Sequence, residues 1–144
     1  MSMSNTNNAL ILLARILLSF MFILAGFGKV TDAAGTAGMI AGAGLPAATL
    51  LAYVAGLFEL LAGLAVLTGF QVRIVGWLLA GFCVFTGVVF HLPYASGAEL
   101  VNILNQIMVM KNITLAGAYI LLATVGAGAY SIDARRSPQA VAAR

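Results

Sequence analysis

Four separate segments of about 20 residues are almost entirely apolar, and this feature restricts the fold more than any other. They cover about residues 9–30, 48–70, 72–91 and 112–130. A helix needs about 20 apolar residues to cross the hydrocarbon core of a bilayer. Only 8% of the 144 residues are charged, against about 25% in soluble domains, so the chain could not cover a water-soluble fold with polar side chains. The sequence therefore predicts one all-α domain, an integral membrane four-helix bundle.

Capping residues and prolines mark the ends of these segments. Asn7 or Asn8 can cap the first helix, Pro46 can stand in the first turn of the second, and Pro93 ends the third. Only residues 69–73 separate the second segment from the third. We expect these two helices to be antiparallel neighbours.

The two longer connections each carry a short helical pattern. Residues 31–46 are rich in Gly and Ala and predict an interfacial helix around residues 37–41. In the connection GAELVNILNQIMVMK, five apolar residues lie at helical spacing on one face: Leu100, Ile103, Leu104, Ile107 and Met108. This pattern predicts a second interfacial helix, lying on the membrane surface over residues 97–109. The alternative is that this segment extends the fourth membrane helix.

Lysine and arginine predict the orientation of the chain in the membrane. An even number of crossings places both termini on one side, and that side holds Arg73, Arg135, Arg136 and Arg144. The other side holds only Lys29 and Lys111. Because cytoplasmic loops carry the excess of Lys and Arg, both termini are predicted to be cytoplasmic.

Residues 131–144 are predicted to form a basic cytoplasmic tail that anionic membrane lipids attract. The net charge is +3, but the basic residues do not form a basic face with interleaved aromatic residues. Nucleic acid is therefore not an expected partner.

Arg15 and Glu59 stand inside apolar segments, where a charge facing lipid is costly. Arg15 shares a helical face with Ser19 and Gly26, and Glu59 shares one with Gly56. Small residues let helices approach closely, so both charges are expected to face the bundle interior and to pair with each other. The pair can be a ligand site or an ion pair that only fixes the helix register.

A second group of polar residues lies at the predicted outer boundary. It consists of Lys29, His91, Lys111 and Asn112, with Asp32 nearby. These side chains can surround an outward-facing mouth that binds a ligand. The alternative is that each lysine only extends its charge to the membrane surface and that His91 only ends its helix.

The sequence lacks the residue clusters that metal-binding and covalent chemistry need. His91 is the one histidine and Cys83 the one cysteine, so no metal site is expected. There is no Gly-rich phosphate loop and no nucleophile elbow. We therefore expect neither a covalently bound cofactor nor an independent catalytic activity.

Three stretches resemble the DoxX family of small bacterial inner-membrane proteins. They are AGFGK at the end of the first segment, GLFELLAGLAVLTGFQVRIVG, and MKNITLAGAYILLATVGAGAYSID. The resemblance covers about residues 10–133 and implies a four-helix membrane protein. It marks as characteristic Arg15, Lys29, Glu59, Lys111 with Asn112, and residues 126–128.

The resemblance also implies a class of function. Subunits associated with archaeal thiosulfate:quinone oxidation give the family its name, so we expect a subunit or partner of a membrane oxidoreductase or respiratory system, without its own redox centre. The chain lacks the paired cysteines of four-helix thiol-quinone reductases, and their thiol chemistry is not carried over.

Two alternatives stay open from the residues themselves. One is a quinone- or lipid-binding protein that uses Arg15 and Glu59. The other is a small proton-coupled transporter in which Glu59 carries the proton. Membrane lipids are expected partners in each case, and further copies of the chain are candidates as well.

The predicted orientation can be tested by fusing alkaline phosphatase, which is active only in the periplasm, after Arg144. We expect an inactive fusion because the terminal side carries the excess of arginine. An active fusion would contradict the orientation and would move Lys29 and His91 to the cytoplasmic side.

Overall fold

In a computed structural model of the protein, the structure describes residues 4–136. Within that range every regular element is a helix, and there is no strand. Four helical spans are long and apolar enough to cross a membrane. They are α1 (Asn5–Thr31), α3 (Ala48–Thr68), α4 (Val72–Thr86) with its extension to Tyr94, and α5 (Leu100–Val125). The predicted all-α membrane bundle is thus confirmed.

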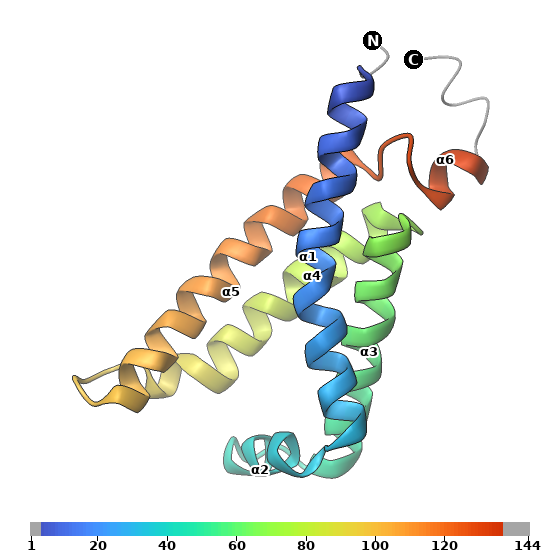
Figure 1. The fold of residues 1–144 in the computed structure, drawn as a ribbon. Helices are drawn as coiled ribbons and strands as arrows, with labels where there is room; N and C mark the ends of the chain where they lie inside the picture. Colours follow the sequence, from blue (N-terminus) through green and yellow to red (C-terminus); the bar gives the residue numbers. More distant parts are fainter. Residues whose placement is uncertain (1–3, 137–144) are drawn as a thin grey trace.

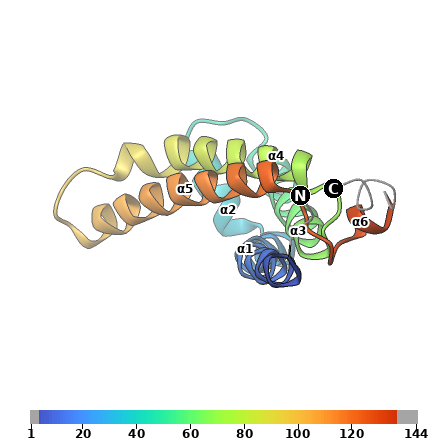
Figure 2. The same ribbon diagram turned by 90° about the horizontal axis from the view of Figure 1, so that it is seen from above.

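The four helices form two pairs. α1 packs along α3, and α4 packs along α5 (Figures 1 and 2). The pairs meet where α1 begins and α5 ends, and they separate toward the opposite end, where the short helix α2 (Ala34–Gly42) lies. We call these two ends the Arg15 end and the α2 end.

Glycines allow the backbones of α1 and α3 to approach closely. A Cβ atom on Gly26 would collide with the backbone nitrogen of Leu60. A Cβ on Gly63 would lie 2.9 Å from Cγ1 of Ile23. The small-residue faces expected from the sequence are therefore the faces that meet.

Aromatic rings join the two pairs near the middle of the molecule. Phe22 of α1 lies edge-on to Tyr119 of α5, with 5.5 Å between ring centroids, and to Phe82 of α4 at 6.3 Å. The Tyr119 hydroxyl donates a hydrogen bond of 2.8 Å to the carbonyl oxygen of Leu18. This bond satisfies a polar group that would otherwise be buried without a partner.

The outer faces of all four long helices are apolar and exposed. They include Leu17, Phe20, Leu61, Ile74, Trp77, Ile113 and Leu121. A surface of this kind suits acyl chains rather than water.

The short helix expected around residues 37–41 is confirmed as α2. The second one is wrong as a separate element, because α5 begins at Leu100 and continues without a break through Asn112 to Val125. No glycine or proline stands between residues 100 and 116, so nothing in that segment ends the helix. The alternative, an extended fourth membrane helix, is therefore the correct one, and the expected start at residue 112 was too late.

The first and third helices also differ from expectation at their ends. Ser4 caps α1 by accepting a hydrogen bond from the backbone nitrogen of Asn7, so neither Asn7 nor Asn8 is the cap. The third span stays helical to His91, as expected, but its last turn, η1 (Gly87–His91), is π-helical. A 3-10 turn, η2 (Leu92–Tyr94), then contains Pro93. π-helical turns in α-helices are frequent at functional sites.

The short connection at residues 69–71 does make α3 and α4 antiparallel. The two helices lie close only near this turn and diverge toward the α2 end (Figure 1). The two helices are therefore antiparallel neighbours, as expected, but they contact each other only near the turn. The close partners are α1 for α3 and α5 for α4.

The close approach of α1 and α3 can be tested by adding one methyl group. Gly26→Ala should destabilise the protein by about 1–3 kcal/mol, because the new methyl meets backbone atoms of α3. Gly28→Ala is the matched control, because nothing lies within 4 Å of that position. Thermal unfolding in detergent measures both variants. Equal melting temperatures for the two variants would contradict the packing.

Candidate functional site

Arg15 is 1% exposed, and carbonyl oxygens surround its guanidinium group. Nε donates to the oxygen of Val66 at 2.8 Å, and Nη2 donates to that of Leu67 at 2.6 Å. Nη1 donates to the oxygens of Ala127 at 2.7 Å and Tyr130 at 2.9 Å. Val66 and Leu67 lie in the last turn of α3, where carbonyls lack helical partners. One side chain of α1 thus holds the end of α3 and the chain that follows α5.

The turn between α3 and α4 is built around this arginine. Gly69 has a φ of 73°, and a Cβ there would lie 2.8 Å from the Arg15 guanidinium carbon. The Asp133 carboxylate accepts hydrogen bonds from the backbone nitrogens of Gln71 at 2.8 Å and Val72 at 3.1 Å, which caps the start of α4. Asp133 lies in the short helix α6 (Ile132–Arg136). The Arg15 end is therefore fully occupied by contacts that hold the fold together.

The expected pair between Arg15 and Glu59 is wrong. Arg15 reaches the unpaired carbonyls at the end of α3, which lie at its own level, whereas Glu59 points to the opposite end. The Glu59 carboxylate instead accepts a hydrogen bond of 2.7 Å from Lys29 Nζ. The side chains of Lys29 and Glu59 are 23% and 7% exposed, respectively. Gly56 makes room for this pair, because a Cβ there would lie 2.8 Å from Cβ of Lys29.

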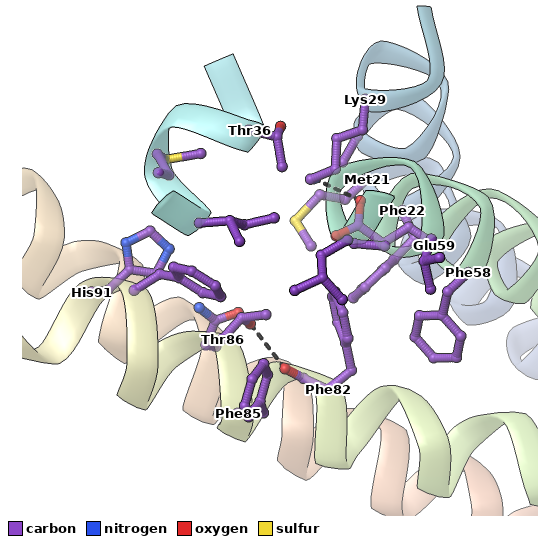
Figure 3. A pocket seen from close by; sticks show the side chains of 18 of the residues that line it. Met21, Phe22, Lys29, Thr36, Phe58, Glu59, Phe82, Phe85, Thr86 and His91 are labelled. Carbon is purple, nitrogen blue, oxygen red and sulfur yellow. Dashed lines mark hydrogen bonds and ion pairs between the residues drawn. The ribbon is translucent and has the colours of Figure 1, made fainter. Parts of the chain in front are cut away.

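A cavity of about 550 Å³ lies beside this ion pair, between the two helix pairs. It reaches the α2 end, and residues of α1, α2, α3, α4, η1 and α5 line it. Figure 3 shows Lys29 and Glu59 on one wall and Thr86, Phe85 and His91 on the facing wall. Most of the lining is apolar: Met21, Phe22, Ala25, Met39, Ile40, Leu45, Leu51, Val54, Ala55, Phe58, Leu78, Phe82, Phe85 and Phe90.

Few polar side chains line the cavity, and hydrogen bonds fix the positions of two of them, Lys111 and His91. Lys111 donates to the thioether sulfur of Met108 at 3.1 Å. His91 Nδ1 lies 3.0 Å from the Asn105 side-chain oxygen. Asn105 uses its amide nitrogen to donate to the carbonyl of Val101, so its oxygen accepts and His91 Nδ1 carries the proton. Nε2 of His91 remains for another partner.

Of the six candidate site residues, five line this cavity: Lys29, Glu59, His91, Lys111 and Asn112. Arg15 does not, and neither does Asp32. The aromatic wall of Phe58, Phe82, Phe85 and Phe90 was missed. Phe82 and Phe85 are spaced three apart on one helix, a signal that marks a shared face. The sequence does not show that these two rings face a cavity, because the cavity exists only where the two helix pairs separate.

Metal ligation finds little support in the geometry. Residues 4–136 contain no group of three or more His, Cys, Asp or Glu side chains that could hold a metal ion. Cys83 is buried in the core, where it packs with Leu79 and Tyr119.

The pairing of charges predicts a specific pattern of coupling in a double-mutant cycle. Lys29→Leu and Glu59→Leu should each destabilise the protein, and the double variant should recover part of the loss. A single change leaves one buried charge without its partner, so we expect a coupling of about 0.5–3 kcal/mol. Arg15→Leu should cost well over about 2 kcal/mol, because it removes four charge-assisted hydrogen bonds.

The matched cycle combines Arg15→Leu with Glu59→Leu. Because these side chains do not touch, their effects should add within about 0.5 kcal/mol. Thermal unfolding in detergent measures both cycles. If Glu59→Leu recovered the stability lost in Arg15→Leu, the two side chains would be coupled, and this result would contradict the structure.

Comparisons with known proteins agree with this architecture. The DoxX family model matches residues 10–92. Inner membrane protein YqjF of Escherichia coli (strain K12) is 42% identical over 123 residues, which are 85% of this chain and 88% of that protein. Inner membrane protein YphA of the same organism is 35% identical over 126 residues, 88% of this chain and 89% of that protein. No solved structure matches. The chain therefore belongs to the DoxX family and is a multi-pass inner-membrane protein.

Proposed function

We propose that this chain binds one amphipathic molecule of the quinone or lipid class in the cavity between its helix pairs. The observation that carries the proposal is the cavity itself, about 550 Å³ of space with mostly apolar walls and a few polar groups. Small-molecule sites have this composition and volumes of about 300–1,000 Å³. Tightly packed membrane helices would otherwise close such a space.

The apolar wall suits a hydrocarbon tail or a flat ring. Phe58 and Phe82 lie together with 5.0 Å between ring centroids, and Phe85 lies edge-on to Phe90 at 6.2 Å. The four rings come from α3, α4 and η1 and therefore span both helix pairs. Rings of this size provide large apolar area at defined positions.

The polar groups suit a head that accepts hydrogen bonds. The ammonium of Lys111 and the amide of Asn112 can donate to ligand oxygens. His91 Nε2 and Glu59 add acceptors at the same cavity. Glu59 and His91 lie on facing walls of the cavity (Figure 3), so polar groups can contact a head from both sides.

The position of the cavity supports entry from the bilayer. Val54 of α3 and Leu78 and Phe85 of α4 line the cavity, and each is about half exposed, at 53%, 53% and 51%. They belong to α3 and α4, which diverge toward the α2 end (Figure 1). A membrane-dissolved molecule can therefore reach the site between these two helices without passing through water.

The other functional hypotheses remain predictions. One hypothesis makes the chain a partner of a membrane oxidoreductase or respiratory complex. Such a complex could use a protein that binds a quinone or lipid, so this hypothesis is compatible with the proposed function. Transport coupled to Glu59 would need this carboxylate to leave its 2.7 Å contact with Lys29 during each cycle. With cytoplasmic termini, the cavity would lie in the periplasmic half of the membrane.

Filling the cavity tests the proposal. Protein purified in a mild detergent should retain quinone or lipid, identified by mass spectrometry of an organic extract. Ala55→Phe places a ring in the cavity and should lower this retention at least about tenfold, a loss of about 1.4 kcal/mol. Ala14→Phe is the matched control, because Ala14 is exposed on α1. Equal retention by the two variants, or no retained amphiphile in the unaltered protein, would contradict the proposal.

A further inference from the structure

We infer that the ligand carries an anionic head, a carboxylate or a phosphate, which Lys111 and Asn112 bind. This inference rests on the proposed function and narrows the amphipathic class to acidic lipids. It depends on three observations: the charges around the cavity, the depth of Lys111, and the side chain of Asn112.

The lining of the cavity carries one more positive charge than negative charge. Two lysines and one glutamate line it. Lys29 and Glu59 neutralise each other at 2.7 Å. Lys111 has only the thioether of Met108 as a hydrogen-bond partner among the described residues, and a thioether is a weak, neutral acceptor. A neutral ligand would leave this charge uncompensated, whereas an anion would balance it.

The position of Lys111 along α5 also supports a partner in the cavity. α5 spans Leu100–Val125, so Lys111 is near the middle of the helix. At 1.5 Å per residue, about 16 Å of helix precede it and about 21 Å follow it. The expectation that it lies at the outer boundary assumed a helix that begins near residue 112. Charged side chains at such depth face the interior and bind a partner.

Asn112 adds a donor next to this charge. Its residue surface is only 7% exposed, it lines the cavity, and no hydrogen bond within residues 4–136 involves its side-chain amide. Among the described residues no buried side-chain nitrogen or oxygen lacks a hydrogen-bond partner, so the amide atoms of Asn112 are open to the cavity, where a ligand can pair with them. Because Lys111 and Asn112 are consecutive and both line the cavity, they can donate to two oxygens of one head.

The remaining lining agrees with an acyl chain attached to this head. The cavity that Lys111 and Asn112 line is also lined by Phe82 and Phe85 of α4 and by Val54 of α3, and Val54 and Phe85 are about half exposed. A tail that extends from the head toward these residues would contact apolar rings and then reach the bilayer. The volume of about 550 Å³ favours a single chain in the cavity.

The test compares probes that share a chain of 16 carbons and differ in the head. Palmitate offers a carboxylate, hexadecyl phosphate a phosphate, and hexadecanol a neutral hydroxyl. Binding to the purified protein in nonionic detergent is measured by native mass spectrometry. Palmitate or hexadecyl phosphate should bind at least about tenfold more tightly than hexadecanol, as expected for a charge-assisted contact, and the stronger of the two identifies the head. Inorganic phosphate alone should not bind measurably, because it lacks the chain.

Variants assign the preference to Lys111. Lys111→Met should reduce the preference for anionic heads to about one while hexadecanol still binds, which shows that the cavity remains intact. Lys111→Arg should keep most of the preference. Arg136→Gln is the charge-matched control, because Arg136 lies over the Phe70 ring at the Arg15 end and should leave the preference unchanged.

Each contrary outcome has a defined meaning. Equal binding of hexadecanol and palmitate, or an unchanged preference in Lys111→Met, would overturn the anionic head. Tight binding of a short-tailed ubiquinone without any anionic preference would also overturn it, yet would leave the proposed function standing. Failure of every probe to bind the unaltered protein would overturn both.

Discussion

The guanidinium group of Arg15 is the contact on which the arrangement of the helices depends. It binds four carbonyl oxygens that belong to the end of α3 and to the chain after α5. These carbonyls would otherwise be buried without donors at the ends of helices, and the arginine would be a buried charge without partners. A single side chain of α1 therefore fixes where the two helix pairs meet. Asp133 completes the same end by capping α4.

Closing the molecule at one end allows it to stay open at the other. The pairs are held together at the Arg15 end and diverge toward α2 (Figure 1), and the cavity lies where they diverge. The buried charges consequently divide into two groups. Arg15 serves the fold, whereas Lys29, Glu59 and Lys111 lie on the wall of the cavity. The separation of these groups explains how so few charged residues can both hold the helix ends and line a cavity.

Much of this could be predicted from the sequence, because lengths of apolar segments and faces of small residues are local properties. The four spans, the inward faces of α1 and α3, and five of the cavity residues followed from them. The partner of Arg15 did not, because backbone carbonyls at a helix end leave no sign in the residue types. The length of α5 was misjudged because its first turns are amphipathic. The angle between the helix pairs depends on contacts between segments far apart in the chain.

The central claim is that the helix pairs are joined at the Arg15 end and hold a ligand between them at the α2 end. The most direct test is a crystal structure of the protein grown from a lipidic mesophase, without delipidation. We expect Arg15 on the carbonyls of Val66, Leu67, Ala127 and Tyr130, and elongated density that runs from Lys111 and Asn112 to the gap between α3 and α4. A structure in which α4 and α5 pack against α1 and α3 along their whole length, with no space beside Glu59, would contradict the account.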